Sequence, residues 1–209
     1  MKKILIWAAV ITLFFITTFI GTGIVNEEKL KSDYYVLIAD IGELFKDHAQ
    51  KEDYFYNRSY SRSEEIAQLL EGRVTDKGFH LIVQSIFDEF NELYVYKPQY
   101  QEYISDTRNF SQKQKETNYY DTVRDTILNP ALGLIPFEAL KITKDKNRVV
   151  ITGQDVLVVF YDNREKFVEY HRYARFGFPP SDYISFSLAF IYDNGIYLLD
   201  DFIINPQAM

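Results

Sequence analysis

The stretch DYISFSLAFIYDNGIYLLDDFII, residues 182–204, decides the fold that we predict for this chain. Its first half alternates large apolar side chains with small ones, a period of two that is typical of a half-buried strand. Asp193-Asn194-Gly195 interrupts the alternation, and Asn and Gly tolerate the positive φ angles that hairpin turns need. A second apolar run covers residues 196–204. The stretch therefore predicts an antiparallel hairpin at the carboxyl end, against which the upstream segments pack.

The residues around the turn are compatible with two registers of this hairpin. A two-residue turn pairs Tyr192 with Tyr197 and directs Asp201 towards the aromatic face of the first strand. A turn with a glycine bulge pairs Tyr192 with Ile196 and directs Asp200 to that face instead. The second register buries more apolar surface, so it is the one that we expect. Asp200 would then be a carboxylate among aromatic side chains.

Upstream of the hairpin, the periodicity changes from helical to strand-like near residue 139. Helices first and antiparallel strands afterwards predict an α+β fold in which helices pack on one face of a curved antiparallel sheet. We expect helices over residues 26–50 (capped by Asn26), through Leu70 after a capping box of Ser61 and Glu64, over 75–93 (capped by Thr75) and over 118–128. We expect loops over 51–62 and 94–117, and strands over 139–143, 148–152, 155–161 and 167–175, with Gly153 as a bulge.

The amino-terminal segment is strongly apolar. Residues 4–25 carry no charge and follow Lys2 and Lys3. As a helix they would be about 33 Å long, enough to cross a hydrocarbon core of about 30 Å. An uncleaved single-pass anchor is the leading interpretation, with the domain on the extracytoplasmic side. A cleaved signal peptide is the alternative, because Gly21-Thr22-Gly23 offers small residues at a suitable spacing, and the product would then be secreted. A buried soluble helix is the third interpretation.

These features predict three parts: an anchor or signal peptide over 1–25, a linker helix and loop over 26–62, and an α+β domain over 63–209. The chain of 209 residues has a formal net charge of −7, which argues against nucleic acid as a partner, because phosphate binding needs clustered Lys and Arg. It contains no Cys, which excludes disulfides, thiolate metal sites and a cysteine nucleophile. We expect the membrane as one partner, through residues 4–25, and an envelope protein or a second copy of the chain as another.

The order of these elements resembles the NTF2-like superfamily. The resemblance is carried by the exported Lys-Lys leader, the amphipathic helices, the connector Ile135-Pro136-Phe137 and the closing run FIYDNGIYLLDD, residues 190–201. More narrowly, the chain is similar to membrane-anchored extracytoplasmic proteins of Bacillus-type bacteria. The resemblance implies a cone-shaped fold with a pocket between helix and concave sheet, and often a dimer through the sheet. Superfamily members include enzymes, binding modules and scaffolds, so the fold does not select a function.

Few residues are candidates for chemistry. His171 and Asp200 are weak candidates for an acid-base pair, since a His beside a carboxylate can act as a general base. A solvated sheet face is the competing interpretation for His171, and a solvated or hydrogen-bonded strand-end residue for Asp200. The three histidines are far apart in the sequence and predict no metal site, and we expect no cofactor. The candidate ligand pocket consists of Tyr170, Arg172, Phe190, Tyr192 and Asp200.

No nucleophile elbow, phosphate-binding loop or zinc-protease motif occurs in the chain. The leading hypothesis is therefore a non-catalytic, membrane-anchored binding or scaffold module of the bacterial cell envelope. The first rival is a pocket enzyme that uses His171 and Asp200. The second is a small-ligand sensor whose pocket is lined by aromatic rings without a general base.

Overall fold

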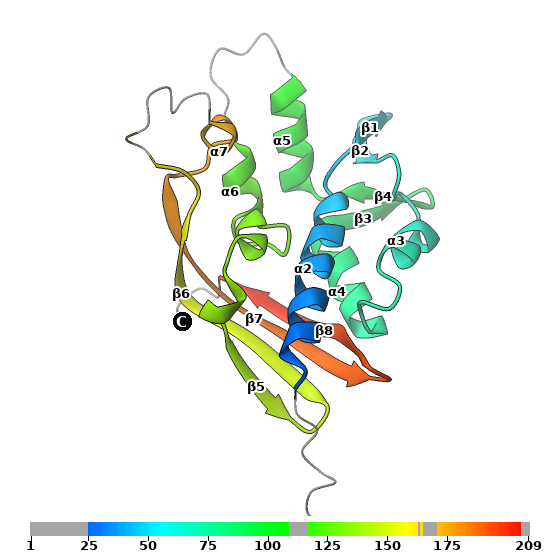
Figure 1. The fold of residues 1–209 in the computed structure, drawn as a ribbon. Helices are drawn as coiled ribbons and strands as arrows, with labels where there is room; N and C mark the ends of the chain where they lie inside the picture. The colour runs from blue at the N-terminus through cyan, green and yellow to red at the C-terminus, as the bar shows by residue number, and fades with distance from the viewer. Residues whose placement is uncertain (1–24, 109–116, 163, 165–170, 206–209) are drawn as a thin grey trace, which may run out of the picture.

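The structure, a computed structural model, describes residues 25–108, 117–162, 164 and 171–205. It confirms the α+β class: a four-stranded antiparallel sheet in the order β5-β6-β7-β8 has helices on one face, and two small antiparallel hairpins lie beside them (Figure 1). The helices are α2 (Glu27–Glu43), α3 (Ser63–Leu69), α4 (Asp76–Ile86), α5 (Pro98–Arg108), α6 (Tyr119–Val123) and α7 (Arg172–Arg175), with 3-10 turns η1 (Pro130–Gly133) and η2 (Phe137–Ala139). The strands are β1 (His48–Lys51), β2 (Tyr54–Asn57), β3 (Phe87–Phe90), β4 (Leu93–Tyr96), β5 (Lys141–Asp145), β6 (Arg148–Val159), β7 (Ser181–Asp193) and β8 (Ile196–Ile204).

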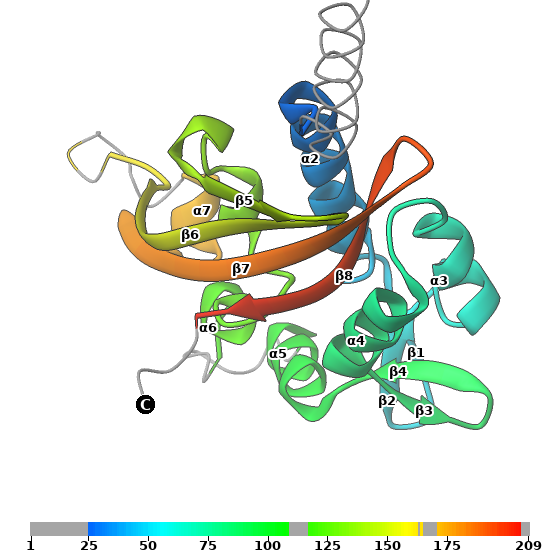
Figure 2. The ribbon, with the colours of Figure 1, turned by 90° about the horizontal axis from the view of Figure 1, so that it is seen from below.

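The long sheet is curved, and α4 and α5 lie on the side of β8 that faces away from β7 in the view from below (Figure 2). β6 is one strand with a bulge between Gly153 and Val156, which confirms the bulge predicted at Gly153 and joins the two strands expected there. Within the described residues no helix is long and apolar enough to span a bilayer. Residues 1–24, which hold nearly all of the expected anchor, lie outside the described part.

The carboxyl-terminal hairpin forms as predicted, but the register that we expected at its turn is wrong. Tyr192 pairs with Tyr197, so the turn has two residues, and Asn194 and Gly195 have φ angles of 48° and 90°. Further along β8 the register shifts by one residue, since Phe190 pairs with Leu199 while its neighbour Ala189 pairs with Asp201. Asp200 is the extra residue. The bulge lets both halves of β8 bury apolar side chains, which neither uniform register achieves.

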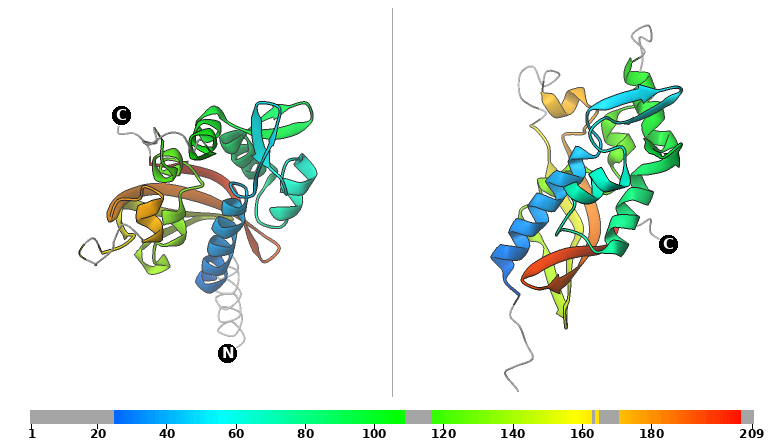
Figure 3. Two further views of the ribbon diagram at one scale, coloured as in Figure 1. Left: turned by 90° about the horizontal axis from the view of Figure 1, so that it is seen from above. Right: turned by 90° about the vertical axis from the view of Figure 1, so that its right-hand side faces the viewer.

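The amino-terminal helix is confirmed, with its cap: the Asn26 side chain accepts from the Lys29 N–H at 3.0 Å. It ends at Glu43 rather than at residue 50, because the chain turns at Asp47 (φ 46°) and enters the β1–β2 hairpin. The expected loop over 51–62 therefore contains strands. Figure 3 shows α2 beside the sheet, with the β1–β2 hairpin beyond its carboxyl end.

Three further expectations need correction. The helix predicted over 75–93 begins at its Thr75 cap but ends at Ile86, and its last part forms β3, which pairs with β4 across a turn where Asn91 and Glu92 have positive φ. The segment expected as a loop over 94–117 holds β4 and α5. The strand expected over 167–175 is contradicted at 172–175, which is the short helix α7; residues 167–170 lie outside the described part.

Helix α4 packs unusually closely on β8, and this contact fixes the position of α4 on the sheet. The Thr75 N–H donates to the Leu199 carbonyl at 2.9 Å, and the Leu199 N–H donates to the Arg73 carbonyl at 2.8 Å. A Cβ on Gly78 would lie 2.1 Å from the Leu199 carbonyl oxygen, so only glycine permits this approach. The core then fills the space between the sheet and helices α2, α4, α5 and α6.

Candidate functional site

Asp200 does not line a pocket; its side chain links helix α4 to the sheet. Its Oδ1 accepts from the Thr75 hydroxyl at 2.9 Å, and its Oδ2 lies 3.6 Å from both Lys77 Nζ and an Arg148 guanidinium nitrogen. Thr75 is also the amino-terminal cap of α4, because its side chain accepts from the Gly78 N–H at 3.1 Å. The bulged carboxylate therefore anchors the start of α4 to β8.

His171 lies at the other end of the sheet. It precedes α7, where its Nδ1 accepts from the Tyr173 N–H at 3.4 Å and its ring lies 5.2 Å from that of Tyr161. Asp200 lies beside Phe190, which is near the end of β7, whereas α7 lies near Pro180, which directly precedes β7. About 30 Å of β7 separates these two positions. The structure does not bring the candidate acid and base together.

The other predicted pocket residues are also dispersed. Phe190 is fully buried in the core. Tyr192 is 43% exposed near the β7–β8 turn, where its ring lies 4.8 Å from that of Tyr197. Arg172 is exposed on α7 and lies over the ring of Tyr173. Tyr170 lies outside the described residues.

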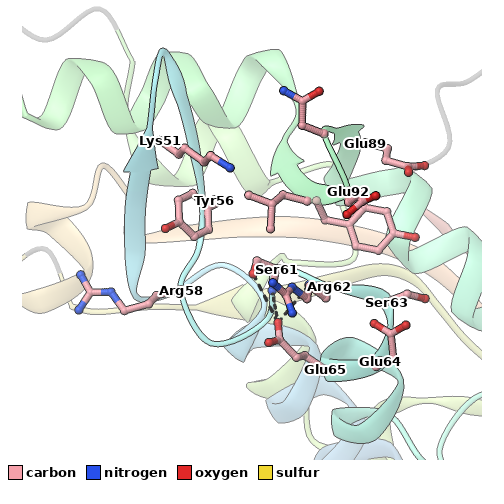
Figure 4. A pocket seen from close by; sticks show the side chains of 13 residues that line it. Lys51, Tyr56, Arg58, Ser61, Arg62, Ser63, Glu64, Glu65, Glu89 and Glu92 are labelled. Atoms are coloured by element: carbon pink, nitrogen blue, oxygen red, sulfur yellow. Dashed lines mark hydrogen bonds between the residues drawn. The ribbon is translucent and has the colours of Figure 1, made fainter.

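A large hollow in the described part of the chain lies elsewhere, between the two small hairpins (Figure 4). We call it the hairpin groove; its volume is about 970 Å³, against about 450 and 410 Å³ for hollows beside the start of α2 and beside α6. It is lined by Lys51, Tyr56, Arg58, Ser61, Arg62, Ser63, Glu64, Glu65, Glu89, Asn91, Glu92, Leu93 and Tyr94.

Hydrogen bonds to backbone groups hold the segments around the groove together. The Glu65 carboxylate accepts from the N–H groups of Ser61 and Arg62 at 2.8 and 3.0 Å, which fixes the loop that precedes α3. The Tyr94 N–H donates to the Ser61 carbonyl at 2.8 Å and joins this loop to β4. Asn57, only 1% exposed, ties the end of β2 to the end of α2. The groove is thus built into the fold.

The charged side chains of the groove come from both hairpins, and Arg62 lies between them at the start of α3, beside Glu65. Lys51 comes from the β1–β2 hairpin and Arg62 from the loop after it, whereas Glu64 comes from α3, and Glu89 and Glu92 from the β3–β4 hairpin. Figure 4 shows Lys51 and Arg58 on one side of the groove and the three carboxylates on the other. Among the described residues, Arg58 has a distant partner, Asp47 at 3.9 Å, while Lys51, Arg62 and the three glutamates make no ion pair. The groove therefore presents separated, unneutralised charges.

Sequence reasoning missed this site because we expected residues 51–62 and 94–117 to be loops. The signal that was available is the pair of short runs Tyr54-Phe55-Tyr56 and Leu93-Tyr94-Val95-Tyr96, whose aromatic and β-branched residues favour strands. The described residues hold no group of three or more His, Asp or Glu side chains placed to bind a metal ion.

A pH-sensitive group lies at the start of β1, on the hairpin that carries Lys51. The Nε2 atom of His48 is buried and has no hydrogen-bond partner among the described residues, and the ring packs 4.9 Å from Phe45 and 5.3 Å from Tyr96. Burial lowers the pKa of His48 below its usual 6.5, and the nearby Arg108 lowers it further; a hydrogen bond to the Phe45 backbone opposes these effects.

We therefore expect the protein to lose stability as the pH falls below about 6.5. The unfolded chain takes up a proton on His48 near that pH, while the folded chain resists protonation, so acid favours unfolding. His48→Phe should remove this component of the pH dependence, measured as the free energy of unfolding in urea between pH 7.5 and 5. His80→Gln should keep the dependence. If the free energy of unfolding changes equally with pH in the parent protein and in His48→Phe, His48 is not the group responsible.

Comparison of this chain with protein-family models, with curated proteins and with solved structures finds no match.

Proposed function

We propose that the protein is a non-catalytic binding module of the cell envelope, held at the outer face of the membrane by residues 4–25, with the hairpin groove as its binding site. The uncharged run behind Lys2 and Lys3 supports the anchor and the orientation. The antiparallel sheet with helices on one face supports, at the level of architecture, the NTF2-like fold proposed for the body. The observation that carries the proposal is the groove itself.

Unpaired charges around a hollow favour binding over a purely structural role. Surface charges that only solvate a protein are normally interspersed, and many pair with neighbours, as Lys46 does with Glu43. Here three cations and four carboxylates line one concavity, and five of them, Lys51, Arg62, Glu64, Glu89 and Glu92, make no ion pair among the described residues. An acid-base enzyme is supported less well, because His171 and Asp200 lie at opposite ends of β7 and hold other partners.

Site-specific crosslinking in intact cells tests the proposal. We expect a photo-crosslinking amino acid at Tyr56 or Tyr94 to give a light-dependent adduct, because both side chains line the groove. The control is the same amino acid at Leu157, which is 51% exposed on the sheet and outside the groove. The proposal fails if the groove positions give no more adduct than Leu157, or if cell fractionation places the chain in the cytosol.

A further inference from the structure

We infer that the ligand of the hairpin groove is a polypeptide segment that carries acidic and basic side chains at separate positions. This inference rests on the proposed function, because it specifies the ligand of the same groove. It follows from three properties of the groove. Its charges are separated, an aromatic surface lies between them, and backbone N–H and carbonyl groups of β2 and β4 already have hydrogen-bond partners.

The arrangement of charges favours a ligand that carries both positive and negative groups. A polyanion would pair with Lys51 and Arg58 but would be repelled by the four glutamates that line the groove. A polycation would pair with the glutamates but would be repelled by Lys51 and Arg58. A single exposed ion pair contributes only about 0.2–1 kcal/mol, so one contact does not hold a ligand. A segment whose acidic end faces Lys51 and Arg58 and whose basic end faces Glu64, Glu89 and Glu92 gains from both sides at once.

The surface between the charges accommodates a chain of ordinary side chains. Tyr56, Leu93 and Tyr94 line the middle of the groove and are each partly buried. Their rings and methyl groups can pack against the aliphatic parts of a peptide. A neutral sugar could stack on the same tyrosines but would leave five charges unpaired, and a lipid tail needs an enclosed apolar cavity rather than a polar groove.

Within the groove, the segment is recognised by its side chains and does not pair as an additional strand with β2 or β4. At β2, the N–H and carbonyl of Phe55 are both occupied by the Gln101 side-chain amide, at 2.7 and 2.9 Å. At β4, the Tyr94 N–H already donates to the Ser61 carbonyl. Strand addition needs free main-chain groups along an edge, and these positions do not offer them.

Fluorescence anisotropy with the full-length protein in nanodiscs tests the inference. The probe is a fluorescein-labelled peptide with a glutamate pair and a lysine pair separated by Gly-Ser-Gly. The comparison probes are the same peptide with four glutamates, the same peptide with four lysines, and a labelled neutral oligosaccharide. We expect the peptide that carries both charges to bind at least ten times more tightly than each comparison probe, and its binding to weaken as salt is raised.

Variants of the two sides sharpen the test. Lys51→Glu with Arg58→Glu, and separately Glu89→Lys with Glu92→Lys, should each weaken binding of the peptide that carries both charges about tenfold or more. Combining all four substitutions should restore binding, because the peptide can bind in the opposite direction. The matched controls outside the groove, Lys141→Glu with Lys146→Glu and Glu71→Lys with Glu102→Lys, should leave binding unchanged.

The outcomes separate this inference from the proposed function. The inference is overturned if the four-glutamate peptide, the four-lysine peptide or the oligosaccharide binds as tightly as the peptide with both charges, or more tightly. It is also overturned if the variant with all four substitutions does not regain binding. If the groove crosslinks in cells to a polysaccharide, the binding function stands and the peptide ligand is excluded. If the groove crosslinks to nothing, the proposed function itself is overturned.

Discussion

Replacing Gly78 with alanine is expected to destabilise the protein by about 3 kcal/mol or more, which for a chain of this size lowers the melting temperature by roughly 6–12 °C. The added Cβ would lie 2.1 Å from the carbonyl oxygen and 2.9 Å from the carbonyl carbon of Leu199. Both atoms belong to the backbone of β8, so no side chain can rotate away. Helix α4 would have to shift by about 1 Å to restore normal contact distances.

That shift would also break the contacts that dock α4 on the sheet. The Thr75 N–H bond to the Leu199 carbonyl and the Thr75 hydroxyl bond to Asp200 both measure 2.9 Å and have little room to lengthen. The matched control is Gly42→Ala in α2, where no atom lies within 4 Å of an added Cβ. This control should be neutral or stabilising by up to about 1 kcal/mol, because alanine favours helices. Equal urea midpoints for the two variants would show that α4 does not approach β8 this closely.

Replacing Asn57 with leucine is expected to cost about 3–5 kcal/mol, because this amide uses all of its hydrogen-bonding capacity in a buried site. Its Nδ2 donates to the carbonyls of Glu43 and Leu44 at 2.8 and 3.1 Å, where α2 ends. Its Oδ1 accepts from the N–H groups of Ser59 and Tyr60 at 2.9 and 3.0 Å. Leucine has a similar volume but leaves four main-chain groups without this partner.

Asn57→Asp should be similarly damaging for a different reason. It keeps an acceptor for Ser59 and Tyr60 but directs a carboxylate oxygen at two carbonyl oxygens. Both variants should also weaken binding in the hairpin groove, because Asn57 positions the loop that carries Arg58 and Ser61. Asn194→Asp, at the exposed β7–β8 turn, makes the same chemical change and should be nearly neutral, because Asp also tolerates the φ of 48° found there. Urea unfolding of the three variants measures these effects, and a small loss for Asn57→Leu would contradict them.

The sequence predicted the elements whose signals are local. The alternation in residues 182–204 predicted the hairpin, and the caps Asn26 and Thr75 marked the starts of α2 and α4 correctly. Each signal depends on residues within a few positions of one another. The end of α4 was predicted wrongly because Phe87, Phe90 and Leu93 have helical spacing, while the structure uses them in two paired strands. Spacing alone does not distinguish these alternatives in so short a segment.

The hairpin register and the groove depend on contacts that are distant in sequence. We chose between two uniform registers, but β8 uses the two-residue turn and then absorbs Asp200 as a bulge. The bulged residue bonds to Thr75, which is 125 positions away in the sequence. The groove combines residues from two hairpins, a loop and α3, and their charges have no periodicity that a sequence pattern could reveal.

The fastening of α2 to the sheet has a mechanical consequence. The Asn26 N–H donates to the Tyr197 hydroxyl at 3.1 Å, and Asp33 accepts from the Tyr197 N–H at 3.3 Å, so the helix is fixed to β8 from its first turn. The uncharged run ends at Val25 in the sequence and α2, which is about 26 Å long, begins at Glu27, so the helix can act as a lever. A tilt of roughly 10° at Asn26 would swing the far end of that lever by about 4 Å. If residues 4–25 cross a bilayer, as proposed, the thickness and curvature of that bilayer would set the orientation of the folded body.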